Sequence, residues 1–170
     1  RFACLRGISP HAAGPFAKGS LYMGLMDKVY GIRTPDHVSF ARMVTGLAQN
    51  DQAHGVVWHQ GFKHIEYGLN YFVGNIRDDK SIRQQGYSGK FEIEVAENSR
   101  MGMSYLDSES DFQRTNLKSL HWRHALEKGG SLLSEIGIID KDPRLPGRVT
   151  ERGTYFFQQG MLKLARGLHL

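Results

Sequence analysis

The chain has few of the features that identify secreted, membrane-spanning or processed proteins. Its 170 residues include one cysteine, Cys4, so no disulfide can form within the chain and a disulfide-framed secreted module is excluded. No apolar run approaches the ~20 residues of a membrane-spanning helix. The chain starts at Arg1 without a methionine, which is consistent with trimming or with removal of a targeting peptide. These observations predict a soluble, folded protein without membrane insertion.

Catalytic and nucleotide-binding motifs are also lacking. The segment most similar to a phosphate-binding loop, Gly86–Phe91, lacks both the glycine spacing and the hydroxyl residue after the lysine that such a loop requires. There is no dinucleotide-binding glycine pattern and no serine nucleophile elbow. Glu92 and Glu94 could be drawn as an acid–base pair, but we expect them to lie on a solvated face. The sequence therefore predicts no enzyme activity, no catalytic residue and no cofactor.

Eight histidines raise the question of a metal site. His54, His59 and His64 are five residues apart, and each step turns a helix by ~140°, so they do not share a helical face. His121 and His124 could share a face, but two imidazoles without a neighbouring carboxylate or thiol do not make a site. We expect solvated or core histidines and no bound metal.

Apolar spacing is the strongest positive signal. Tyr22, Leu25, Met26 and Val29 follow the three-, four- and seven-residue spacing of a helix. The segment 30–36 contains a glycine and a proline, both of which end helices. It also contains an aspartate that can cap a second helix, which we expect over 38–47. A third helix is expected after 49–51. Trp58 and Trp122 fall on such stripes, which predicts core positions for both; if exposed, they would instead mark a protein interface.

The remaining chain also favours helices. The cleanest amphipathic run extends from Phe62 to Ile76, and a capping box at 110–113 opens a further helix that ends near Gly129. Short helices are expected over 132–137 and 157–168, after the proline-rich linker 140–148. Residues 90–95 alternate as a strand does, but a lone strand has no pairing partner, so we interpret them as helix. The prediction is an all-α fold of about seven helices.

Part of this pattern resembles the pentatricopeptide repeat family. In that family a helix ending in methionine precedes a Gly-Ile-x-Pro-Asp turn, and here Met26 precedes Gly31-Ile32-Arg33-Thr34-Pro35-Asp36. The match covers about one repeat, with one extra residue in the turn, and a generic helical hairpin explains the same residues equally well. The resemblance implies a short α-solenoid of degenerate hairpins over residues 15–170. A base-reading side chain would occupy the position of Ala41, whose methyl group cannot read a base, so sequence-specific RNA binding is not expected.

By size, basic composition and degenerate repeats, the chain also resembles the pentatricopeptide-like extra subunits of the mitochondrial ATP synthase head in trypanosomes and euglenoids. The resemblance implies a non-catalytic structural subunit in the mitochondrial matrix, bound outside the F1 head to its α subunit. The alternative is a mitochondrial RNA-binding or ribosomal protein. The chain has 22 basic and 17 acidic residues, a net charge of +5, but the basic residues are scattered, whereas a nucleic-acid-binding surface usually clusters them. Residues 1–14 are expected to form an extended arm. The candidate partner-binding residues are Phe2, Leu5, Ile8 and Phe16.

Overall fold

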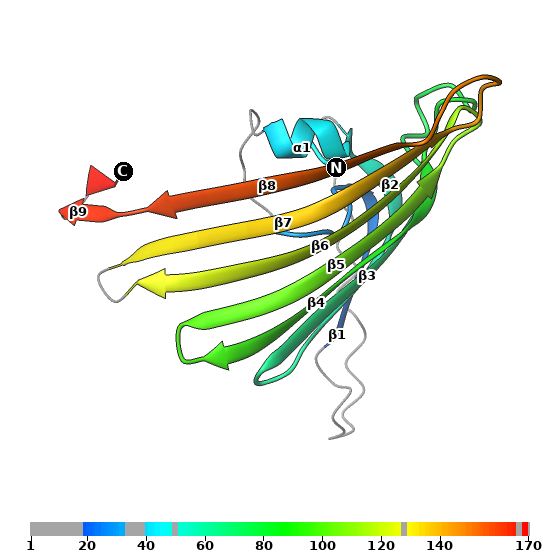
Figure 1. Cartoon of the computed structure of the whole chain (residues 1–170). Coiled ribbons are helices and arrows are strands. Elements are labelled where there is room, and N and C mark those ends of the chain that lie inside the picture. Colours follow the sequence, from blue (N-terminus) through cyan, green and yellow to red (C-terminus); the bar gives the residue numbers. More distant parts are fainter. Residues whose placement is uncertain (1–18, 33–39, 49–50, 127–128, 166–167, 170) are drawn as a thin grey trace, which may run out of the picture.

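One long antiparallel sheet dominates the protein. The computed structural model describes residues 19–32, 40–48, 51–126, 129–165 and 168–169. Eight strands are hydrogen-bonded in chain order, so each strand pairs with its neighbours in sequence (Figure 1). They are β1 (Gly19–Met26), β2 (Ala53–Gly61), β3 (Ile65–Phe72), β4 (Gln85–Ala96), β5 (Ser99–Glu109), β6 (Gln113–Leu126), β7 (Gly130–Pro143) and β8 (Glu151–Met161).

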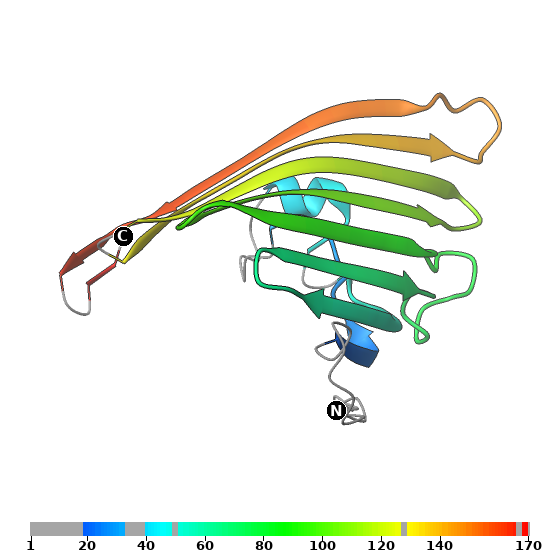
Figure 2. The same ribbon diagram turned by 90° about the horizontal axis from the view of Figure 1, so that it is seen from below.

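Three small elements complete the described part of the chain. The helix α1 (Phe40–Thr45) follows β1, and a two-stranded ribbon of β9 (Lys163–Ala165) and β10 (Leu168–His169) follows β8. The sheet bends into a trough, and α1 lies inside the bend together with the segment that follows β1 (Figure 2). We call the trough side of the sheet the inner face and the opposite side the outer face.

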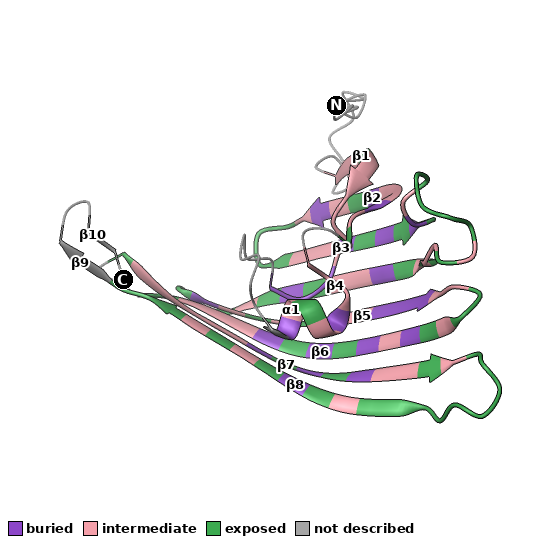
Figure 3. Cartoon of the chain, turned by 90° about the horizontal axis from the view of Figure 1, so that it is seen from above, coloured by how far each residue is buried: buried purple, intermediate pink, exposed green. Residues whose placement is uncertain are grey.

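The hydrophobic core is small and lies on the inner face. Phe72, Leu106, Leu117 and Ile139 project from four strands, and Tyr155 and Tyr30 continue the cluster toward α1. Ala41 and Leu47 pack on it from the helix and the turn after it. Buried and exposed positions alternate along most strands (Figure 3), as expected for side chains that point to opposite sides of a sheet.

The structure shows that the prediction of an all-α solenoid is wrong. In the described residues strands predominate, and the single α-helix has six residues. The run from Phe62 to Ile76, predicted as one long helix, contains β3 and the turn after it. The segment 90–95, interpreted as helix, belongs to β4 and pairs with both β3 and β5. Its strand periodicity was the correct signal, because its partners are other strands that had been assigned to helices.

Other predicted helices are corrected in the same way. The box at 110–113 is a hairpin turn between β5 and β6, in which the Ser110 amide donates to the Gln113 carbonyl at 2.8 Å. The predicted helices over 132–137 and 157–168 fall on β7, β8 and the β9–β10 ribbon. Only the helix expected over 38–47 has a counterpart, α1. The predicted arm 1–14 and its candidate residues Phe2, Leu5, Ile8 and Phe16 lie outside the described residues.

Candidate functional site

A continuous group of exposed apolar side chains covers the centre of the outer face. Cross-strand register places one apolar side chain beside the next, as in the row Phe91–Met103–Leu120–Ile136–Phe156, which crosses five strands. Leu120 is 60% exposed and Phe156 is 63% exposed. We call this surface the apolar band; its members are Leu69, Phe91, Ile93, Met101, Met103, Leu120, Ile136, Ile138 and Phe156. It contains a shallow depression of about 810 Å³.

Tyrosines and then ion pairs border the apolar band at one end. Tyr71, Tyr87 and Tyr105 project from neighbouring strands, and the rings of Tyr87 and Tyr105 are 6.0 Å apart. Beyond them Arg114 donates two hydrogen bonds to Asp107, at 3.0 and 2.7 Å, which hold the pKa of that carboxyl below its usual range. The side chains thus change from apolar to aromatic to ionic along the strands.

Both tryptophans lie on this face, and the prediction of core positions is wrong for Trp58. Trp58 is in register with Leu69 of the apolar band and is 43% exposed. Trp122 is in register with Met101 and is partly buried, with its ring stacked on that of His124. The helical stripes that placed them in a core do not exist in the sheet.

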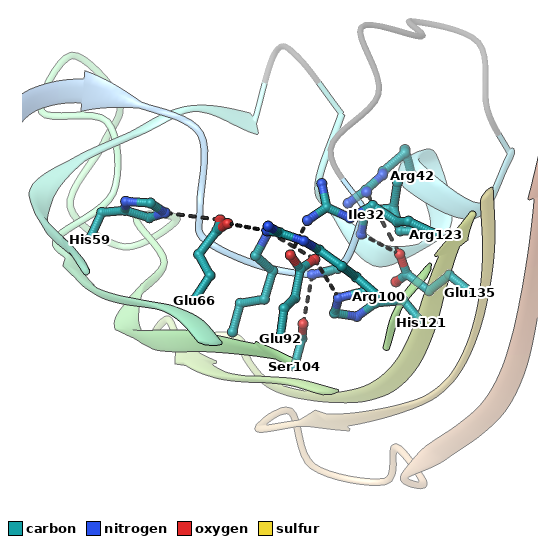
Figure 4. A network of polar contacts seen from close by, with 12 residues as sticks. Ile32, Arg42, His59, Glu66, Glu92, Arg100, Ser104, His121, Arg123 and Glu135 are labelled. Carbon is teal, nitrogen blue, oxygen red and sulfur yellow. Dashed lines mark hydrogen bonds and ion pairs between the residues drawn. The ribbon is translucent and has the colours of Figure 1, made fainter. Parts of the chain in front are cut away.

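The inner face carries the opposite chemistry, and Glu92 is its most buried charge. Glu92 is 1% exposed and His121 is 3% exposed, and His121 Nε2 lies 2.8 Å from a Glu92 oxygen. Lys90 Nζ is 3.3 Å away, and Arg123 contacts the second oxygen (Figure 4). The expectation that Glu92 lies on a solvated face is therefore wrong.

The surroundings of Glu92 favour its charged form. Its oxygens are held by the His121 ring and by the cationic side chains of Lys90 and Arg123, which take the place of water around the carboxylate. Gly102 lies between the two partners, where an added Cβ would be 2.5 Å from His121 Nε2. The glycine thus leaves room for the Glu92–His121 contact.

A second carboxylate, Glu66, continues the charged row on β3. It is the register partner of Glu92 and bonds to His59 and Arg100, each at 3.0 Å (Figure 4). Glu66 thus has one partner on β2 and one on β5. The inner face therefore holds alternating acids and bases across the trough.

A third carboxylate, Glu135, binds the segment inside the trough. Its oxygens accept hydrogen bonds from the Ile32 backbone N–H and the Tyr155 hydroxyl, each at 2.7 Å. Arg42 of α1 is 3.8 Å from the same carboxylate. Sequence reasoning missed Glu135, Glu66 and the inner role of His121.

The histidines that were considered as metal ligands are dispersed. His59 and His64 contact Glu66 and Glu94, and His54 accepts a hydrogen bond from the Ile76 amide. His121 and His124 are three residues apart on β6 and therefore point to opposite faces of the sheet. No group of three metal-ligating side chains occurs among the described residues.

Comparisons with protein-family models, curated proteins and solved structures find no match to this chain. Among the described residues, no helix has the length and apolar character needed to cross a membrane.

Proposed function

We propose that this chain forms a membrane-embedded β-sheet whose outer face contacts lipid acyl chains and whose inner face surrounds a polar interior. The observation that carries the proposal is the inversion of the two faces. Large apolar side chains are exposed on the outside, while Glu92, Glu135, His121 and several serines are buried inside. A sheet that packs one face on a hydrophobic core in water exposes polar side chains on its other face, whereas this sheet exposes large apolar ones there and buries charges beside its small inner core.

The length of the apolar segments fits a bilayer. On β4 the outward positions from Tyr87 to Val95 span nine residues and include no charge. A strand that crosses a bilayer at a tilt needs ~9–11 residues. The tyrosine border and the ion pairs beyond it match the sequence of environments from hydrocarbon to interface to water, because aromatic side chains concentrate at the interface.

Lipid explains this surface better than a protein partner or water does. The apolar band extends over β3 to β8, whereas soluble monomers rarely expose patches above a few hundred Å². Lys118, its charged neighbour, is in register with Tyr105 at the border, from which a lysine can extend toward water. The inner charges meanwhile bond to one another, as side chains do where bulk water is limited.

In a membrane, the backbone groups at the two edges of the sheet need hydrogen-bond partners. β1 and β8 are the edge strands of the described sheet, and each has a partner on one side only. An unpaired backbone group costs several kcal/mol in hydrocarbon, roughly what a lost hydrogen bond costs in an apolar medium. The proposal therefore requires that other strands pair with both edges in the membrane.

The role expected on the mitochondrial ATP synthase head remains a prediction, which co-purification with the α subunit would test. Its premise was a helical repeat, and the sheet removes that premise. The expectation of a matrix location came from the same resemblance, whereas the expectation of no membrane insertion came from the lack of a long apolar run, and both remain predictions. The apolar band provides more direct support for a lipid environment.

Arginine substitutions at two depths test the proposal. Leu120→Arg places a charge in the middle of the apolar band and should cost ~2–4 kcal/mol of folding free energy in phospholipid vesicles. Thr154→Arg is the matched control, because Thr154 is exposed and shares a register row with Lys118 near the border. It should cost about 0–1 kcal/mol. Equal effects of the two substitutions, measured by reversible denaturant unfolding from vesicles, would contradict lipid contact.

A further inference from the structure

We propose that the inner face lines a route for small hydrated ions across the membrane, and that Tyr30–Ile32, here called the inner strap, closes it. This inference rests on the proposed membrane placement. The inner strap lies within the trough, over the inner surface of the sheet, between the charged row and α1 (Figure 4). At this position the inner strap would block ions that move along the inner face.

The inner strap is attached through side chains of the sheet. The Gly31 N–H donates to Ser104 Oγ at 2.9 Å, and the Ile32 N–H donates to Glu135 at 2.7 Å. The Tyr30 hydroxyl is 3.0 Å from that of Tyr155. None of these contacts is a strand-to-strand backbone bond, so the strap can leave while the sheet keeps its register.

Gly31 shows how closely the inner strap approaches its anchor. Its φ is +54°, a conformation that glycine adopts readily. A Cβ at this position would lie 2.4 Å from both oxygens of Glu135. Backbone conformation and the space beside the carboxylate therefore both favour glycine at the point where the strap is held.

The surface beneath the inner strap is polar and lined by small side chains. Ser104, Ser119 and Gly137 form one register row across β5, β6 and β7. The neighbouring row contains Glu92, His121 and Glu135, whose carboxylates have cationic partners. If the strap moved away, the two serine hydroxyls and charges of both signs would contact a hydrated ion. An apolar solute would find no complementary surface there.

Conductance across planar phosphatidylcholine bilayers in potassium chloride tests this inference with the full chain. Wild type should conduct weakly. Glu135→Ala removes the acceptor of Ile32 and should raise the open fraction about tenfold or more, given the usual strength of hydrogen bonds to a charged group. Glu135→Gln should give a smaller rise because the amide oxygen can still accept. The matched control, Glu97→Ala, changes an exposed carboxylate in the β4–β5 turn and should leave conductance unchanged.

A second variant and a second measurement make the result decisive. Gly31→Ala disturbs the anchor from the strap side and should also raise conductance. Hydrogen exchange of the peptide containing residues 30–32 should be faster in each opened variant. Faster exchange with wild-type conductance would overturn the inference, and so would a wild type that already conducts as well as Glu135→Ala. Flotation of the same samples with vesicles separates these outcomes from failure of the proposed function, in which the protein would not associate with lipid.

Discussion

At the scale of single residues, the inner face is stabilised by a few buried carboxylates with several partners each. Glu92 contacts Lys90 of its own strand, β4, and both His121 and Arg123 of β6. A buried carboxylate is tolerated only when it is paired and hydrogen-bonded. Glu92 thus ties β4 to β6 through side chains, with β5 between them.

Removal of Glu92 should leave its buried partners without a counter-charge. We expect Glu92→Ala to lower the free energy of unfolding by ~3–5 kcal/mol, the range for one lost partner of a buried pair. Glu97→Ala, the exposed control on the neighbouring turn, should change it by no more than ~0.5 kcal/mol. Denaturant unfolding compares the two variants. A loss at Glu92 as small as that at Glu97 would show that the charge cluster does not stabilise the sheet.

The sequence allowed part of this site to be predicted. The alternation of Glu92 and Glu94 with apolar residues indicates a polar face, and both do share the inner face, but Glu92 is buried there rather than solvated. The burial of Glu92 could not be predicted, because its partners His121 and Arg123 lie about thirty residues away in the sequence. They meet Glu92 only through the register of β4, β5 and β6. The contact of Glu135 was harder still to predict from the sequence, since its partner Ile32 is 103 residues away.

At the scale of elements, the apolar outer face explains why strands resembled helices. In β3 and its neighbours both faces carry some apolar residues: Leu69 points outward, and Phe72 joins the small inner core. Mixed faces produce three- and four-residue spacings by coincidence, and these favour a helix in a pattern analysis. The alternation at 90–95 was clear because there the inner face is entirely charged.

Glycines within strands test how tightly the elements fit. Gly102→Ala on β5 should destabilise the sheet by ~1–3 kcal/mol, because the new Cβ would lie 2.5 Å from both His121 Nε2 and the Phe91 carbonyl oxygen. Gly61→Ala on β2 is the control, since nothing lies within 4 Å of its added Cβ. That change should be neutral or stabilising by up to ~1 kcal/mol. Similar unfolding midpoints for the two variants would show that the inner face relaxes around Gly102.

At the scale of the whole molecule, one sheet separates two environments. Its outer face has an apolar centre and an aromatic and ionic border, and its inner face holds paired charges and the inner strap. Each strand contributes to both faces through alternate residues, so the same register that aligns the apolar band also aligns the charged row. We infer from this arrangement that the solvent of the outer face is lipid.

Tryptophan quenching tests this central claim most directly, because the chain has two tryptophans and Trp58 and Trp122 both lie on the outer face. The full chain would be folded into vesicles whose acyl chains carry bromine, which quenches indole fluorescence on contact. The account predicts strong quenching by brominated lipid, weak quenching by aqueous iodide, and emission shifted to the blue relative to the unfolded chain. Strong quenching by iodide with no effect of brominated lipid would show that the outer face is in water and would contradict the account.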